Sequence, residues 1–140
     1  MKEKLKEIED LVNEIEVDII KLQSLFSNFL KQHLKGLIIE KYIGEYPTFM
    51  EPVILGDRVK IGDDVLIGPY VYIGENSEIG NYVELSNTII YNNTKIGDNI
   101  KLDNCIVTKN CKLNFNNSSI KNCILKGIAN SEKEVLKIYF

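Results

Sequence analysis

The chain has 140 residues, of which 44% are hydrophobic and 26% are charged, and its formal net charge is -3. This composition is typical of a single soluble globular domain and excludes a disordered chain. The negative net charge and the presence of only one arginine, Arg58, argue against nucleic acid as a partner.

No apolar run approaches the roughly 20 residues that cross a bilayer, so we expect no association with a membrane. The first ten residues, MKEKLKEIED, lack the apolar stretch of a signal peptide, and we therefore expect a cytoplasmic protein. The cysteines are odd in number and include no C-x-x-C pair; they are Cys105, Cys111 and Cys123. We expect them to be reduced thiols, not disulfides or zinc ligands.

Residues 1–36 carry a heptad repeat, which is the pattern of a helix with one apolar seam. No proline or glycine interrupts this repeat before Gly36. Large β-branched residues at both core positions favour three or four strands, so we expect one helix that forms a trimeric coiled coil. The alternative is an amphipathic helix that lies against its own domain. The predicted oligomerisation residues are Leu5, Ile8, Val12, Ile15, Ile19, Leu22, Phe26 and Phe29.

The only histidine, His33, falls at the next core position of this repeat. In a parallel trimer, three copies of His33 would meet at the axis, where they could bind an ion or respond to pH. The simpler interpretation, which we favour, is a polar residue at the frayed end of the helix.

Residues 37–130 form a second segment, in which a strict period of six runs from Leu55 to Glu84. Each hexad begins with a bulky aliphatic residue and glycine, as in Ile61-Gly62, and has a small or β-branched residue at its fifth position. Such repeats predict an all-β fold, a left-handed parallel β-helix of about five coils, in which three short strands form one triangular coil. An antiparallel β-sandwich would instead show a period of two. The glycines expected at turns, where a β-carbon would strain the backbone, are Gly56, Gly62, Gly68, Gly74, Gly80 and Gly97.

A second repeat supports this prediction. The segments LSNTII, LDNCIV and IKNCIL, which begin at residues 85, 102 and 120, recur at intervals of about one coil. Asn87, Asn104 and Asn122 should therefore stack in a ladder at one corner. Residues 131–140 combine a capping-box pattern with apolar residues, and we expect this tail to cover the end of the β-helix.

Residues 52–113 resemble the β-helix domain of sugar-1-phosphate nucleotidyltransferases, particularly the bifunctional enzymes that also acetylate an amino sugar. The resemblance is carried by IGNYVELSNTII at residues 79–90 and by the following Thr94-Lys95. It implies assembly as a homotrimer, and acetyl-CoA or another acyl-CoA is the cofactor that it suggests. The candidate substrate-binding residues that it suggests are Glu84, Asn87 and Lys95.

The sequence departs from that family where catalysis is concerned. The family's catalytic histidine would align near Asp98, a lysine of its motif is replaced by Ser86, and the nucleotide-binding domain is not found beside the β-helix. Acyl transfer needs a general base, for which the candidate catalytic residues are Asp98, Glu84 and His33. For both acids, the interpretation we favour is an ordinary exposed carboxylate. A zinc site of the γ-class carbonic anhydrase type needs three histidines, so no metal site is expected.

Two functions are therefore open, and the sequence does not decide whether the chain is an enzyme. The first, which we favour, is a non-catalytic trimeric module that scaffolds, regulates or binds ligands in sugar-nucleotide metabolism, with a separate sugar nucleotidyltransferase as a partner. The second is a CoA-dependent acyltransferase that acts on a sugar or a sugar nucleotide with an atypical base.

Overall fold

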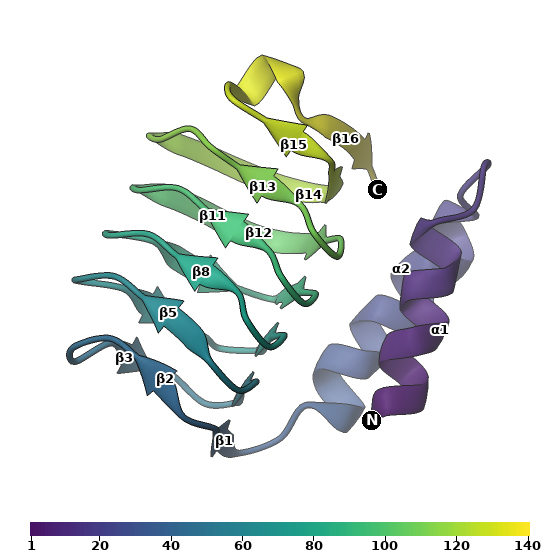
Figure 1. The fold of residues 1–140 in the computed structure, drawn as a ribbon. Helices are drawn as coiled ribbons and strands as arrows, with labels where there is room; N and C mark the ends of the chain where they lie inside the picture. The colour runs from purple at the N-terminus through teal and green to yellow at the C-terminus, as the bar shows by residue number, and fades with distance from the viewer.

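The computed structural model describes residues 1–140, which form a helical hairpin beside a parallel β-helix (Figure 1). The hairpin contains α1 (Lys2–Val12) and α2 (Ile19–Asn28), and a π-helical turn, η1 (Phe29–His33), continues α2. The left-handed parallel β-helix that the hexads predict is confirmed, with about five turns. No helix of the chain is long and apolar enough to cross a membrane.

The β-helix has three faces, each a stack of parallel strands. The covered face, on which the helices lie, contains β1 (Leu37–Ile39), β4 (Val53–Leu55), β7 (Val71–Ile73), β10 (Thr88–Ile90) and the second halves of β12 (Ile100–Val107) and β14 (Ser118–Lys126). The groove face contains β2 (Tyr42–Ile43), β5 (Val59–Ile61), β8 (Glu78–Ile79), β11 (Lys95–Ile96), β13 (Lys112–Leu113) and β15 (Ile128–Ala129). The third face contains β3 (Thr48–Phe49), β6 (Leu66–Ile67), β9 (Glu84–Ser86) and the first halves of β12 and β14.

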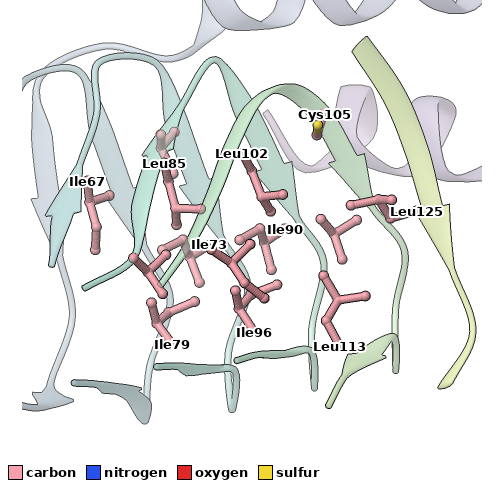
Figure 2. Close-up of a cluster of buried hydrophobic side chains, with 14 of the residues drawn as sticks. Ile67, Ile73, Ile79, Leu85, Ile90, Ile96, Leu102, Cys105, Leu113 and Leu125 are labelled. Atoms are coloured by element: carbon pink, nitrogen blue, oxygen red, sulfur yellow. The ribbon is translucent and has the colours of Figure 1, made fainter. Parts of the chain in front are cut away.

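The interior of the β-helix is a stack of aliphatic side chains (Figure 2). The first and fifth residues of each hexad are buried, and the next coil places an equivalent residue directly on top, as with Ile61 and Ile79. One coil cannot bury its own interior, so the apolar burial that drives folding comes from this stacking. The buried residues in Figure 2 include Ile67, Ile73, Ile79, Leu85, Ile90, Ile96, Leu102, Leu113 and Leu125.

The glycines of the hexads are needed for a different reason from the predicted one. Among the predicted turn glycines, only Gly68 has a left-handed backbone, with φ 109°. In the other hexads the left-handed residue lies two positions later, as at Asp64 (φ 55°) after Gly62. Glycine is required because the next coil lies close: a β-carbon on Gly62 would be 2.7 Å from the carbonyl carbon of Gly80. The stacked glycines therefore let neighbouring coils approach one another.

The asparagine ladder forms at the corner that precedes the covered face. Asn87, Asn104 and Asn122 all have left-handed backbones, which asparagine tolerates better than most residues. The amide of Asn104 donates to Oδ1 of Asn122 at 2.8 Å. Asn87 departs from the pattern and donates instead to Oδ1 of Asp103 at 3.0 Å. The ladder thus stabilises the corner and is satisfied within the chain.

All three cysteines are buried and free, as expected. Cys105 and Cys123 lie in register on neighbouring strands. Hydrogen bonding to Cys123 and burial raise the pKa of the Cys105 thiol, and burial raises the pKa of Cys111 to about 12. Cys105 and Cys111 therefore stay protonated at neutral pH and act as small apolar core residues.

The prediction of a single helix over residues 1–36 is wrong, because residues 13–18 separate α1 from α2 (Figure 1). Asp18 begins α2, and its side chain accepts a hydrogen bond from the backbone N–H of Lys21 at 3.1 Å. This cap satisfies a donor that a continuous helix would pair within its own backbone. Ile15, at the centre of the predicted seam, is fully exposed in the connection. Most other seam residues are buried within the chain itself, which is the alternative arrangement that the pattern allowed.

The helices cover the outward side of one β-helix face. The outward column there consists of Ile54, Tyr72, Ile89, Ile106 and Ile124, in register from strand to strand. These side chains pack with apolar residues of both helices in a second core cluster. The buried hydroxyl of Tyr91 donates to the carbonyl oxygen of Leu5 at 2.6 Å, which fixes α1. The ammonium of Lys126 donates to the carbonyl oxygen of Val12 at the other end of α1.

Residues 131–140 form a 3₁₀ turn, η2 (Glu132–Glu134), and a strand, β16 (Leu136–Tyr139). Strand β16 runs antiparallel to β14 and pairs with its edge on the covered face. The predicted capping box is not completed, because the Ser131 side chain makes no bond to the turn. The Glu134 carboxylate accepts the backbone N–H of Asn130 at 2.8 Å, one residue before the N–H of Ser131 that a capping box would use.

Candidate functional site

The groove face carries a shallow groove of about 490 Å³. The outward residues Lys60, Glu78 and Lys95 lie in register on β5, β8 and β11. The neighbouring corner completes the lining with its stacked glycines and with Asp98, Asn114, Phe115 and Asn116. The groove lining combines both signs of charge, side-chain amides and one half-buried aromatic ring, which suits a polar organic ligand.

The charges in the groove are partly paired. The ammonium of Lys60 lies 3.8 Å from a carboxylate oxygen of Glu78, and both side chains are largely exposed. Exposed pairs of this kind contribute little to stability, so these groups are available to a ligand at small cost. Lys95 is exposed on the next strand, in register with Glu78. The groove therefore presents lysine, glutamate and lysine along one line.

Asp98 belongs to a ladder that links successive coils. Oδ1 of Asn81 accepts the backbone N–H of Asp63 at 2.8 Å. Oδ1 of Asp98 in turn accepts the backbone N–H of Asn81 at 2.9 Å. The side chain of Asn116 continues the ladder by accepting the backbone N–H of Asp98 at 3.0 Å. The Asp98 carboxylate is exposed and has a structural partner, so this candidate base already serves the fold.

The predicted substrate-binding residues do not come together. Lys95 lies in the groove, whereas Glu84 lies on the third face and Asn87 lies at the asparagine corner. Glu84 is 3.3 Å from Lys101 in an exposed ion pair. The structure therefore brings Lys95 and Asp98 to one groove and leaves Glu84 and Asn87 outside it.

The third candidate base, His33, lies at the end of η1 in the helical hairpin. Its ring is stacked on that of Phe29, with ring centroids 6.1 Å apart. It is not among the residues that line the groove. This position matches the simpler interpretation of a polar residue at the end of a helix.

Sequence reasoning missed Lys60, Glu78 and Phe115. A signal for the first two was present, because a charged residue directly precedes the aliphatic-glycine pair in every third hexad, at residues 60, 78 and 95. Three hexads make one coil, so residues repeated at that interval share a face. Phe115 carried no such signal, because the hexad pattern breaks down after Leu113.

A family model for the GMPPB C-terminal domain matches residues 49–136. The chain belongs to this family. The predicted resemblance to the β-helix domain of sugar nucleotidyltransferases is thereby confirmed. The family match begins at the second half of β3, so the helical hairpin and most of the first coil precede it. A search of curated proteins finds no match.

Two solved structures are similar over nearly the whole chain. One is a hexapeptide-repeat acetyltransferase from Vibrio cholerae O1 biovar eltor in complex with acetyl coenzyme A, with 12% identity and a TM-score of 0.33. The alignment covers 97% of this chain and 84% of that one. The other is a maltose O-acetyltransferase from Clostridium difficile 630, with 15% identity, a TM-score of 0.32, and coverage of 99% and 82% respectively.

Proposed function

We propose that the chain is a non-catalytic, homotrimeric β-helix module that binds a sugar nucleotide in its groove and serves a separate sugar nucleotidyltransferase. The family relation supports the link to sugar-nucleotide enzymes. The observation that carries the absence of catalysis is that no candidate base both lines the groove and is free of a structural role. Asp98 holds the corner ladder, Glu84 lies on another face, and His33 is stacked in the hairpin.

The groove chemistry supports a charged, hydroxyl-rich ligand. A nucleoside diphosphate sugar offers phosphates for Lys60 and Lys95, hydroxyl groups for Glu78 and Asp98, and a flat base for Phe115. Lysines bind phosphate as point charges, so this recognition does not require arginine. A groove that is shallow and open suits a regulator that responds to ligand concentration better than it suits an enzyme that must exclude water.

Titration calorimetry with GDP-mannose and UDP-N-acetylglucosamine tests this proposal. Lys95→Ala should weaken binding by about tenfold, which corresponds to one lost charge-assisted contact. Lys101→Ala is the matched control, because Lys101 is an exposed lysine one face further along the chain. Equal affinity of both variants, or no binding by the native chain at millimolar ligand, would exclude the ligand-binding role. Light scattering tests the trimer separately.

The alternative is a CoA-dependent acyltransferase that acts on a sugar or a sugar nucleotide. The presence of Lys95 and Asp98 in one groove favours it, because an acid-base group would then lie beside a phosphate-binding lysine. Thiol release from acetyl-CoA in the presence of an amino sugar measures this activity. Asp98→Asn is the informative variant, since an amide oxygen can still accept the N–H of Asn81 while the base is lost. Turnover that Asp98→Asn abolishes would establish the enzyme and overturn the non-catalytic proposal.

A further inference from the structure

The two ends of the β-helix are finished differently. At the C-terminal end, η2 and β16 add further chain to the last coil. At the other end, β1, β2 and β3 each pair with only one neighbouring strand, on the side of the second coil. Their outer edges are unpaired, because the helical hairpin lies along the covered face and not across this end (Figure 1). Unpaired strand edges of this kind readily pair with another chain.

The core is also open at this end. The inward residues of the first coil are Leu37, Ile39, Tyr42 and Phe49, which lie under Val53, Leu55, Val59 and Ile67 of the second coil. The four residues of the second coil are completely buried. In the first coil, by contrast, Leu37 is 45% exposed and the other three are only partly buried. The first coil therefore presents the floor of the hydrophobic core to solvent.

Further apolar side chains surround this floor. Ile38, Ile43, Tyr46 and Met50 are all exposed large hydrophobic residues. Tyr46 is 94% exposed and has a left-handed backbone (φ 52°), so its ring projects from the corner between β2 and β3. A hollow of about 560 Å³ at the same corner is lined by Tyr46 itself together with Tyr42, Gly44, Glu45, Pro47 and Phe49. The open end therefore presents a group of exposed apolar side chains, which is typical of an interaction surface.

We propose that this end of the β-helix is the interface with a second copy of the chain, in a twofold, end-to-end arrangement. The twofold axis is perpendicular to the axis of the β-helix and passes through the middle of β2 and through the opposite corner, between β3 and β1. Rotation about it reverses the direction of each strand. Strand β2 then meets β2 of the second copy in antiparallel orientation, and β1 meets β3. Each open edge thus receives backbone partners, and Tyr46 of each copy lies against the corner between β1 and β2 of the other.

The charges at the rim fit this axis. Glu40 and Lys41 lie at the corner between β1 and β2, and Glu45 lies at the corner between β2 and β3. The rotation exchanges these two corners, so Lys41 of each copy faces Glu45 of the other. The third corner of one copy faces the third corner of the other, and Lys35 and Glu51 flank this corner. Each Lys41 therefore meets an acidic residue of the other copy, and such complementarity helps to fix the register of an interface.

A second copy fits better than another kind of partner because it brings the same three unpaired edges and the same apolar floor. Only a surface with three short strands around a triangle can satisfy all the open backbone groups at once. The arrangement is independent of side-by-side association through other faces, because it uses only the end. It joins chains in pairs, so two of the proposed trimers would associate end to end into a hexamer.

Analytical ultracentrifugation and light scattering of the full chain test the proposal. We expect an assembly with an even number of copies, and we expect Tyr46→Lys to halve its mass. Tyr82→Lys is the matched control, because Tyr82 is an exposed tyrosine (59%) with the same left-handed backbone (φ 57°) at the same corner two coils further on. A monomer or an odd-numbered assembly at all concentrations, or a mass that Tyr46→Lys leaves unchanged, would refute the interface.

Because Tyr46→Lys would also lose the assembly if it failed to fold, a second test exchanges the charges at the interface. Lys41→Glu places two acids opposite each other and should raise the dissociation constant by about tenfold. The double variant Lys41→Glu/Glu45→Lys restores opposite charges and should recover most of the native affinity. If the double variant associates as weakly as Lys41→Glu alone, the two residues do not face each other and the proposed axis is wrong. Circular dichroism confirms that each variant is folded.

Discussion

The covered face and the groove face are built from the same hexads, yet they have different surroundings. Their inward residues are equally buried, as Ile90 and Ile96 show. Their outward residues differ: isoleucines dominate the covered face, whereas charged residues line the groove face. The inward positions therefore specify the β-helix. The outward positions specify which face another element covers.

The largest effect is expected when a charge is placed on the covered face. Ile106 is completely buried between the β-helix and the helices, so Ile106→Asp would bury an unpaired carboxylate. Such a change should lower the free energy of unfolding by about 4 kcal/mol or more and release the hairpin. Urea denaturation followed by circular dichroism measures the loss. The control introduces the same acid on the exposed groove face: Lys95→Asp should change the free energy of unfolding by less than about 0.5 kcal/mol. Equal losses would show that the helices do not cover this face.

A smaller effect is expected from removing packing on the same face without adding a charge. Ile89 is completely buried in the cluster that joins the helices to β10. Ile89→Ala should destabilise the chain by about 3 kcal/mol, because the lost methylene groups leave a cavity. The control is Lys101→Ala, which removes an exposed ion pair with Glu84 worth less than about 1 kcal/mol. A loss at Ile89 no larger than that of the control would indicate that the hairpin readily detaches.

The β-helix could be predicted from the sequence because its pattern depends only on local positions in each hexad. A buried aliphatic residue followed by glycine recurs whether or not another element covers the outer side of the strand. The covered face also has a signal in the sequence. Three successive apolar residues occur at Val53–Leu55 and at Val71–Ile73. Equivalent triplets occur at Cys105–Val107 and Cys123–Leu125. Strands buried on both sides read as continuous apolar runs, so these triplets indicate a face covered by another element.

The break in the helix and the groove were harder to predict, for two physical reasons. The heptad pattern continues through residues 13–18 without proline or glycine, and only the capping residue Asp18 marks a new helix start. Asp98 and Lys95 were individually predicted, but the groove depends on which hexads share a face. Because three hexads make one coil, comparing every third hexad would have placed Lys60, Glu78 and Lys95 on one line.

The glycine corner beside the groove face should show an intermediate effect. A β-carbon on Gly80 would lie 2.7 Å from the carbonyl carbon of Gly97, so Gly80→Ala must push two coils apart. We expect a loss of about 2 kcal/mol in the free energy of unfolding. The converse change is Asp64→Gly, at a left-handed residue where glycine relieves backbone strain. It should be neutral within about 1 kcal/mol. The opposite ranking would mean that turn conformation, and not coil spacing, requires the glycines.

The smallest effect concerns the hydrogen bond that ties the hairpin to the covered face. Tyr91→Phe removes the hydroxyl that donates to the carbonyl oxygen of Leu5, and we expect a loss of about 1 kcal/mol. Tyr82→Phe, at an exposed tyrosine, should have no measurable effect. Burial raises the pKa of Tyr91 above its ordinary value of 10.0, so the folded state holds this proton more tightly than the unfolded chain does. The native chain should therefore lose stability relative to Tyr91→Phe as the pH rises above about 10, because unfolding then releases the proton. Denaturation at pH 8 and pH 11 measures the difference, and a gap between the two proteins that does not narrow at the higher pH would contradict the buried hydrogen bond.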